Sequence, residues 1–458
     1  MLRSTTIWRQ IYGMMRDATL PADSDLAMSA STKRSALSTL ACLLIGLGVM
    51  CAPPSQAAEE ADEEDDEEAE AIVAPAAAGK PTKAGAVHSN IRRAREQVSL
   101  SERAGGLYAD YGEFKERVEE DYGLSWSLNL SYRWRWQQPA DIARSEQLLF
   151  WPSLNWDIFD SERFGAGSLQ ALYFGERFNY GAIQVGSGAH SQTIESPPYR
   201  NRFGQLTYTH TLPGEKLAVS IGQYSLFMFD SNPYLADQQQ NFVNSAFSEN
   251  PSSTYPVSGL GAYLQYNLRS DLQLLGGFQN GQRGDDRGFS TTGFSDHLYT
   301  WWGHVQWMPN FPGMGSAQYS LTAYRSPELA DTPSSAGWSL NAAQSFNDHW
   351  AVFGRANHSW QNESLSKSSL VAGVAFNNPL GRSATDQIAL SVGASQQDGL
   401  LARRLGTDHS QMIEAYWNWT LLGGGILLTP DLQYIRHPSF APNRDSVLVF
   451  SLRTTLLF

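Results

Sequence analysis

Charged and amide side chains recur at alternate positions along much of this chain, with apolar residues between them. Over residues 124–137, Leu, Trp and Tyr occupy one parity, whereas Arg133 and Arg135 share the other with Ser, Asn and Gln. In a strand with this pattern, one face favours water and the other favours an apolar environment. Where the polar face lines water, its donors and acceptors replace the hydration of a passing solute. The candidate water-facing residues are Asn129, Arg133, Arg135, Gln265, Asn267, Glu414, Asn418, Thr429, Asp431, Gln433 and Arg453.

The charges in this set have mixed signs, because three arginines accompany Glu414 and Asp431. Opposed rows of the two signs would set up a field across a channel, whereas rings of one sign would select ions. The alternative is structural, with each arginine satisfied by a neighbouring acid and bracing the wall. A dedicated phosphate channel is disfavoured, since it would carry a basic ladder without interleaved acids.

The longest connection between expected strands, residues 230–256, combines aromatic rings with amides. Aromatic rings can stack on the C–H faces of pyranose rings, and amides can hydrogen-bond to hydroxyls. Long loops in compact folds are often functional, so two alternatives stand: an inward fold that narrows a channel, or an ordinary external loop. The stacking candidates are Tyr234, Phe242, Phe247 and Tyr255, and the hydrogen-bonding candidates are Gln238, Gln239, Gln240 and Asn241.

The histidine pattern gives little support to catalysis or to a metal site. Seven histidines are scattered over residues 210–437 without a His-x-x-x-His pair, and the chain has no Gly-x-Ser-x-Gly elbow. A hydrolase site assembled from distant strands is the remaining enzyme alternative. We expect no metal, no cofactor and no reaction.

The elements that must position these residues follow a period of two from Leu124 to the C-terminus. Sixteen segments with alternating or β-rich character begin near 124, 147, 167, 202, 216, 258, 271, 298, 316, 337, 349, 368, 386, 411, 425 and 445. Their lengths of 10 to 14 residues suit tilted bilayer spans. Strands of soluble proteins are mostly about five or six residues long. The sequence therefore predicts an all-β fold: an antiparallel transmembrane β-barrel over residues 124–458.

Composition and aromatic placement agree with this fold. Charged residues make up 17% of the chain and aromatic residues 12%, and Trp and Tyr gather near segment ends, as in an interfacial girdle. Residues 72–458 hold 28 basic and 33 acidic residues. Because nucleic-acid binding needs a basic face, nucleic acid is disfavoured as a partner.

Residues 1–57 have the features of a secretory signal peptide: basic Lys33 and Arg34, an apolar run and a small-residue cleavage site. The basic residues come late, so translation from Met28 is an alternative start. The apolar run is about 17 residues long, whereas a membrane-spanning helix needs about 20. Both cysteines fall in this segment, so the exported chain carries none.

Residues 58–105 include ten acidic residues in 59–71 and an Ala- and Pro-rich stretch. Such a segment buries too little apolar surface to fold, so we expect a largely disordered periplasmic tail. Binding of calcium or of a basic partner is the alternative use of the acidic run. Residues 106–123 then predict a short periplasmic helix, with Asp110 as N-cap and Gly123 as the stop.

The last fourteen residues form an alternating apolar strand that ends at Phe458. This ending is similar to the signal by which bacterial outer-membrane barrels are recognised for assembly. Residues 412–458 also resemble the C-terminal signature of the carbohydrate-selective porin (OprB) family. The matching features are Glu414, the segment Thr429–Ile435, Pro438 and Arg453.

The segment GLYADYGEFKERVEEDYGLSWSLNLSY resembles a diverged form of that family's opening segment. It departs from the family at Tyr111-Gly112-Glu113, where Trp-Gly-Gly is frequent. The resemblance implies a sixteen-stranded outer-membrane barrel that passes sugars.

Together, the residues and the resemblance predict passive diffusion of carbohydrates or similar small polar solutes across the outer membrane. A general or anion-preferring porin is the second hypothesis, and a barrel enzyme the third. The expected partners are membrane lipids, lipopolysaccharide, the barrel assembly machinery and small sugars.

Overall fold

The computed structural model describes residues 107–138, 144–178, 199–281, 289–329, 333–346, 349–360, 366–383, 385–397, 408–422, 425–438 and 445–458. The expected leader (1–57) and tail (58–105) lie outside these described residues.

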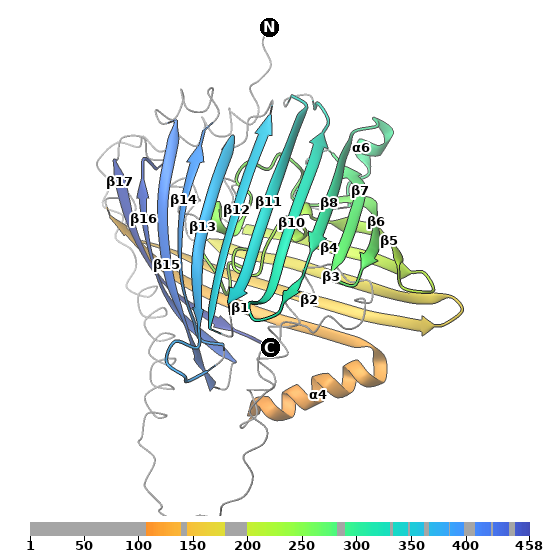
Figure 1. Cartoon of the computed structure of the whole chain (residues 1–458), viewed down its shortest axis with the longest axis horizontal. Helices are drawn as coiled ribbons and strands as arrows, with labels where there is room; N and C mark the ends of the chain where they lie inside the picture. Colours follow the sequence, from red (N-terminus) through yellow and green to blue (C-terminus); the bar gives the residue numbers. More distant parts are fainter. Residues whose placement is uncertain are drawn as a thin grey trace, which may run out of the picture. The chain divides into compact units, whose positions relative to one another are not determined.

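Sixteen long strands form one closed antiparallel sheet, which is the wall of a barrel (Figure 1). Each strand pairs with its neighbours in the chain, and β1 closes the ring by pairing with β17. A further strand of two residues, β9, pairs only with β10. The strands are β1 (Leu124–Gln138), β2 (Arg144–Ser161), β3 (Gly165–Phe178), β4 (Tyr199–Thr211), β5 (Leu217–Tyr224), β6 (Gly259–Arg269), β7 (Leu272–Asn280), β8 (Tyr299–Trp307), β9 (Asn310–Phe311), β10 (Gly315–Ser326), β11 (Ser335–Phe346), β12 (Trp350–Trp360), β13 (Ser368–Asn377), β14 (Gln387–Gln396), β15 (His409–Leu421), β16 (Ile426–Arg436) and β17 (Ser446–Leu456).

Among the described residues, four helical segments accompany the strands: α4 (Leu107–Tyr122), η2 (Leu226–Met228), α5 (Ser245–Ser248) and α6 (Thr292–Ser295). The closed sheet of sixteen strands confirms the predicted fold class, and each predicted segment corresponds to one long strand. Helix α4 begins and ends within one residue of the predicted bounds 106–123.

Side chains alternate between a buried inner face and an exposed outer face along the strands. In β1, Asn129 and Arg133 are buried, whereas Leu128 and Tyr132 are exposed. Inner positions across the barrel are mostly Ser, Thr, Asn and Gln, and outer positions are mostly aliphatic or aromatic. This distribution is the reverse of that in a water-soluble sandwich, where the apolar side chains would be the buried ones.

The two ends of the barrel differ in their connections. At one end, short connections of two to nine residues join β2 to β3, β4 to β5 and every second pair of long strands that follows. Both α4 and the C-terminus lie at this end (Figure 1). We call this the turn end and the opposite end the loop end. The backbone carbonyl of Phe458 accepts a hydrogen bond from the Leu128 amide at 2.8 Å, which holds the chain end on β1.

A girdle of outward aromatic side chains surrounds the turn end. Trp350 stacks on Phe376 with ring centroids 4.4 Å apart, and Trp417 stacks on Trp419 at 5.4 Å. Such rings mark the level where hydrocarbon meets polar headgroups. The turn-end girdle comprises Trp126, Trp156, Tyr266, Trp307, Phe346, Trp350, Phe376, Trp417 and Trp419.

Because proline cannot donate to a sheet ladder, the sequence suggests a bulge or strand end at Pro430. This expectation is wrong, since Pro430 lies inside β16. The register of β16 with β17 is unbroken there. Between β15 and β16, ladder pairing is interrupted where Trp417 lies opposite Pro430 and Asn418 opposite Thr429. The register is the same on both sides of this interruption. The missing ladder contacts are a direct consequence of the absent N–H of proline.

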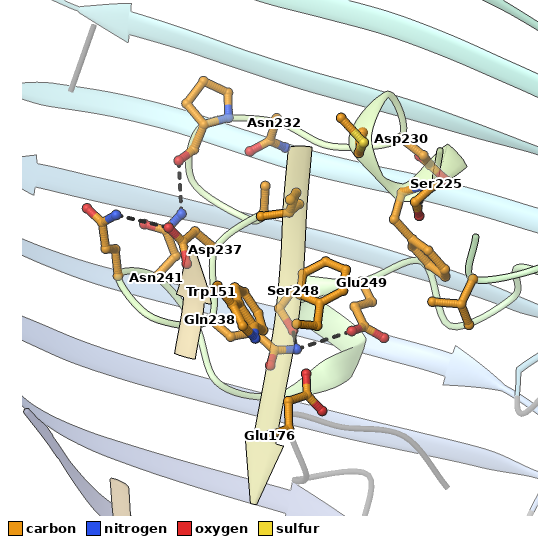
Figure 2. Close-up of a pocket in the computed structure, with 18 of the residues that line it drawn as sticks. Trp151, Glu176, Ser225, Asp230, Asn232, Asp237, Gln238, Asn241, Ser248 and Glu249 are labelled. Atoms are coloured by element: carbon orange, nitrogen blue, oxygen red, sulfur yellow. Dashed lines mark hydrogen bonds between the residues drawn. The ribbon is translucent and has the colours of Figure 1, made fainter. Parts of the chain in front are cut away.

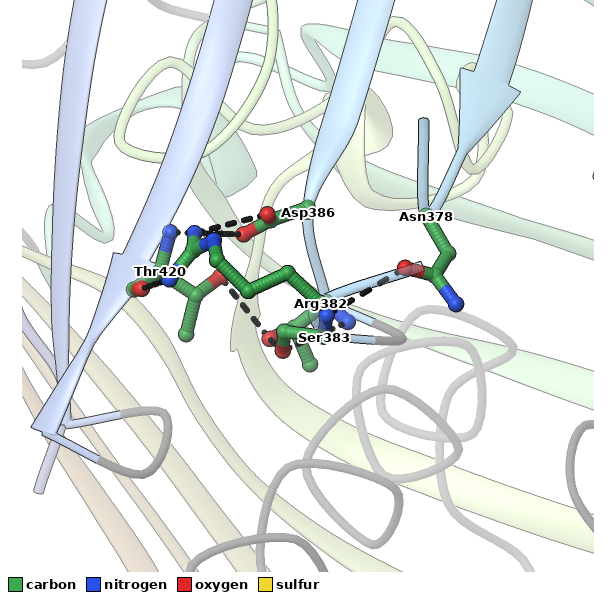
Figure 3. Close-up of polar contacts among 6 residues, drawn as sticks. Asn378, Arg382, Ser383, Asp386 and Thr420 are labelled. Atoms are coloured by element: carbon green, nitrogen blue, oxygen red, sulfur yellow. Dashed lines mark hydrogen bonds and ion pairs between the residues drawn. The ribbon is translucent and has the colours of Figure 1, made fainter. Parts of the chain in front are cut away.

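The β13–β14 turn is fixed to β15 by a compact polar network (Figure 3). The Arg382 guanidinium donates to both oxygens of Asp386 at 2.7 and 2.6 Å, and to the Thr420 carbonyl at 2.6 Å. Asp386 also accepts the Thr420 amide at 2.8 Å. The Arg382 guanidinium lies 5.4 Å from the Trp419 ring centroid, so this network joins the turn to the turn-end girdle.

Candidate functional site

The connection between β5 and β6, residues 225–258, lies inside the barrel, and we call it the inner loop. Its Gln239 side chain donates to backbone carbonyls of β1 and β2, at 3.2 and 3.3 Å. Its Asn232 side chain donates to a β12 carbonyl at 3.3 Å. Gln318 of β10 donates to the Ser231 carbonyl at 3.1 Å. The segment therefore spans the interior between opposite parts of the wall.

Glu414, a predicted water-facing residue of β15, binds the backbone of the inner loop. Its two carboxylate oxygens accept the amides of Val243 and Asn244 at 2.5 and 3.0 Å. The side chain is fully buried. Two successive backbone amides thus donate to one buried side chain, and Glu414 fixes the middle of the loop to the wall.

Two buried arginines hold the loop on either side of this point. Arg453 of β17 donates to the carbonyls of Gln238 and Asn241 at 2.5 and 2.8 Å. Arg355 of β12 donates to three carbonyls at the end of α5, including those of residues 246 and 247 at 2.8 and 2.9 Å. Arg355 thus satisfies carbonyl groups that a helix end leaves without partners, and Arg453 satisfies carbonyls of the turn before it.

Arg133 and Arg135 of β1 lie on the inner face and contact the neighbouring strand β2. Arg135 donates to the Ser145 hydroxyl at 2.9 and 2.7 Å. Arg133 donates to the Gln147 side-chain carbonyl. Both arginines are buried, so in this structure they brace adjacent strands.

The predicted amides of β15 and β16 also contact each other and the inner loop. Asn418 donates to the Gln240 carbonyl at 2.6 Å and accepts from the Thr429 hydroxyl at 2.7 Å. Gln433 donates to Asp431 at 2.9 Å. The structure thus brings Asn418, Thr429, Asp431 and Gln433 together on one part of the inner face.

Gln265 and Asn267 of β6 lie apart from that group. Gln265 is buried and donates to Asn267 at 3.2 Å. Asn267 donates to the Glu215 carbonyl in the β4–β5 turn at 2.9 Å. Asn267 thus stabilises the turn end, away from the inner loop.

The first aromatic group of the inner loop packs against the wall at β12 to β15. Tyr234 stacks on Phe353 at a centroid distance of 5.2 Å and an interplanar angle of 13°. Phe242 contacts Phe247 at 5.6 Å and Tyr416 at 4.8 Å, both edge to face. These three predicted stacking rings are therefore used in packing.

The second aromatic group fills the interior beside β6 to β10. Phe229 stacks on Trp302 with centroids 4.8 Å apart. Tyr255 meets Tyr324 edge to face at 4.8 Å and donates to Asp230 at 2.9 Å. Burial, together with the neighbouring Asp230 charge, raises the pKa of Tyr255 well above its ordinary value. The phenol thus stays protonated and keeps its hydrogen bond at physiological pH.

A cavity of about 160 Å³ remains between the inner loop and the wall of β2 to β4 (Figure 2). Trp151 and Phe174 bring apolar rings to it from the wall, together with the charged side chains of Glu176 and Arg202. The inner loop adds acids and amides. The cavity-lining residues used below are Trp151, Phe174, Glu176, Arg202, Asp237, Gln238, Asn241 and Glu249.

Arg202 lines the cavity, whereas Arg355 and Arg453 do not. The Arg202 side chain is 9% exposed, and its Nε and one Nη have no hydrogen-bond partner. Its guanidinium carbon lies 5.9 Å from the Phe174 ring centroid. An arginine with unused donors, against a cavity, can bind an oxygen acceptor that enters there.

The charged residues of the cavity wall were missed by the sequence interpretation, and a periodic signal exists for one of them, Glu176. Glu176 and Arg202 occupy inner-face positions of β3 and β4. Extending the period-two pattern along β3 would have placed Glu176 inward. In β4, a β-bulge opposite Leu172 and Tyr173 reverses the parity and places Arg202 inward, which the period alone does not predict. The acids Asp237 and Glu249 carry no comparable signal, because the inner loop lacks a period.

The family model for "Carbohydrate-selective porin, OprB family" matches residues 157–458. This chain belongs to the OprB porin family. Among its relatives is Porin AaxA of Chlamydia pneumoniae, 32% identical over 356 residues, which cover 74% of this chain and 80% of that protein. Porin AaxA of Chlamydia felis is 28% identical over 348 residues, covering 73% of this chain and 78% of that porin.

Solved structures of Pseudomonas putida OprB share the fold of this porin. The high-pH structure aligns with a TM-score of 0.63 at 15% identity, covering 76% of this chain and 97% of that one. The low-pH structure aligns with a TM-score of 0.51 at 13% identity, covering 77% and 98%. The porin is therefore an outer-membrane barrel.

Family membership orients the barrel. Porins have short periplasmic turns and longer extracellular loops, so the turn end faces the periplasm. Within the described ranges, no helix has the length and hydropathy needed to cross a bilayer. The described residues also contain no group of three or more His, Cys, Asp or Glu able to hold a metal ion.

Proposed function

We propose that this porin passes carbohydrates, or similarly small polar solutes, by passive diffusion through the cavity between the inner loop and β2 to β4. The two aromatic groups occupy the interior on the other sides of the loop, which leaves this side as the route. The loop is the constriction, and Glu414, Arg453 and Arg355 hold it in place.

The composition of the cavity supports a sugar as the solute. Trp151 and Phe174 supply apolar faces for a pyranose ring, and Arg202 supplies donors for hydroxyl oxygens. Each contact is weak enough to be exchanged for water, as diffusion through a pore requires. The observation that carries the proposal is the buried Arg202 guanidinium with unused donors at this cavity.

A general porin is the second candidate. An anion preference receives less support, because acids outnumber cations among the lining residues: Glu176, Asp230, Asp237 and Glu249 stand against Arg202. This mixture produces a transverse field and gives no ring of one sign. In this proposal the barrel carries out no reaction and needs no cofactor.

Single-channel recording in planar bilayers tests this function. We expect an open conductance that mono- and disaccharides block in a concentration-dependent way. No open conductance would refute the porin function in this form. Conductance with strong anion selectivity and no sugar block would favour the second candidate.

The membrane partners follow from the proposed location and strand order. We expect lipids and lipopolysaccharide to contact the outer face, and the assembly machinery to recognise the last strand through Phe458. Deleting Phe458 should lower the amount of heat-modifiable barrel in isolated outer membranes. Unchanged assembly would remove the terminal residue from this role.

A further inference from the structure

Helix α4 packs on the outer face of the barrel wall. The indole of Trp126 in β1 donates to the Tyr111 hydroxyl at 3.0 Å. Phe114 meets the same indole edge to face, with centroids 6.0 Å apart. The Lys115 ammonium lies 5.7 Å from the Tyr111 ring centroid and 5.6 Å from that of Trp126.

The position of Trp126 fixes the level of this contact. Trp126 belongs to the outward parity of β1 and to the turn-end girdle, at the periplasmic edge of the lipid-facing band. Gly123, with a φ of 67°, ends the helix, and its carbonyl accepts the Asp157 amide at 2.7 Å. The helix is thereby held beside the girdle, and the single residue Gly123 links it to β1.

The face of α4 that packs on Trp126 is apolar and remains partly exposed after this packing. At 100° per residue, Tyr111, Phe114, Val118 and Tyr122 lie on one side of the helix. Phe114 is still 47% exposed and Tyr122 69% exposed. A partly exposed aromatic stripe at the level of an interfacial girdle continues the apolar band of the barrel.

The opposite face of α4 is acidic. Glu113, Glu116 and Glu120 lie there, and all three are exposed. Carboxylates favour water over phosphate headgroups, so this face turns toward the periplasm. The two faces together define an orientation for the helix in the plane of the interface.

We propose that α4 lies in the periplasmic leaflet, where its Phe114 and Tyr122 side contacts the boundary between phospholipid headgroups and acyl chains. The helix extends the girdle beyond the wall and anchors the start of β1. This role is independent of the solute that the barrel passes.

Spin labels on single cysteines test this proposal in the full chain, with Cys42 and Cys51 replaced by Ser. The labelled positions are Phe114→Cys and Tyr122→Cys, with Glu116→Cys and Glu120→Cys as matched controls on the acidic face. Leu264→Cys on the lipid-facing wall and Glu162→Cys in a periplasmic turn calibrate the measurement. Each protein is reconstituted in phosphatidylethanolamine–phosphatidylglycerol vesicles, and heat-modifiable migration verifies its fold.

We expect oxygen to relax the labels at positions 114 and 122 severalfold more effectively than a water-soluble nickel chelate does, as at position 264. Positions 116 and 120 should behave like position 162. Equal access of the nickel chelate to all four helix positions would overturn the proposal, since the helix would then lie in water. Exclusion of both reagents from positions 114 and 122 would also overturn it, because another protein surface would cover the stripe.

Discussion

Two arginines of this porin differ in whether their side-chain nitrogens have hydrogen-bond partners. We relate this difference to a structural role for one and a functional role for the other. Arg382 in the β13–β14 turn meets a fully buried carboxylate and a carbonyl, so its polar contacts are closed within the fold (Figure 3). Arg202 lies against the cavity, with two nitrogen atoms lacking partners. Because buried donors are normally paired, the first arrangement stabilises the barrel and the second is available to a solute.

The largest expected effect concerns Arg382. Arg382→Ala leaves the buried Asp386 carboxylate without its cation, which costs about 3 kcal/mol of unfolding free energy. Urea unfolding of the barrel in lipid vesicles measures this loss. The double variant Arg382→Ala with Asp386→Asn is the control and should recover part of it. A loss below about 0.5 kcal/mol would place Arg382 with ordinary surface residues.

The next effect concerns the anchor of the inner loop. Glu414→Ala leaves two buried amides without acceptors and should cost about 2 kcal/mol. Because the freed loop no longer holds the constriction, single-channel conductance should rise and become noisier. Glu414→Gln keeps an acceptor oxygen and should show a smaller change of the same sign. Unaltered conductance in Glu414→Ala would mean that other contacts suffice to hold the loop.

Arg202 should show the opposite combination of effects. Arg202→Ala should change the unfolding free energy by no more than about 0.5 kcal/mol, because few contacts are lost. It should weaken sugar block about tenfold, the equivalent of one charge-assisted hydrogen bond of about 1.4 kcal/mol. Arg202→Lys, which keeps the charge but loses the planar fork, should give an intermediate block. If Arg202→Ala lost much stability but kept normal sugar block, Arg202 would have a structural role, as Arg382 has, and the comparison would fail.

The smallest effect tests a satisfied carboxylate in a periplasmic turn. Asp271 accepts from Arg269 at 2.9 Å and from the Trp307 indole at 2.9 Å. Slight burial acts to raise the pKa of Asp271, but the two hydrogen bonds and the Arg269 charge outweigh it and hold the pKa below its ordinary value of 3.8.

A depressed folded-state pKa stabilises the barrel above the unfolded-state pKa, and this contribution is lost as the pH falls through the folded-state pKa. Asp271→Asn should therefore cost about 0.5 kcal/mol at pH 7, a small value because the pair is partly exposed. The difference in unfolding free energy between Asp271→Asn and the unmodified protein should disappear at low pH. A difference that persists at low pH would assign the effect to packing.

The barrel itself was predictable because each strand separately meets lipid on one face and the interior on the other. A shift of one residue would turn every Leu and Trp of β1 inward, so period two is enforced strand by strand. The same parity placed Arg133, Arg135, Glu414 and Arg453 on the inner face. The inward position of each of these side chains can thus be predicted from the sequence of its own strand.

The partners of those residues were not predictable, because they depend on a loop without periodicity. Glu414 binds amides 171 and 170 positions away in the chain, and Arg453 binds carbonyls more than 200 positions away. The sequence suggested a field across the channel or braced wall arginines. The structure adds a third use, in which wall charges hold the backbone of the inner loop.

The central claim, that solutes pass between the inner loop and β4, is tested most directly by blocking that route. In a background with Cys42 and Cys51 replaced by Ser, Arg202→Cys is reacted with a bulky methanethiosulfonate while current is recorded. Phe203→Cys is the control, because the adjacent side chain is 38% exposed on the outer face. We predict that modification at position 202 abolishes most of the current and that modification at position 203 leaves it unchanged. Full current after complete modification at position 202 would contradict the account.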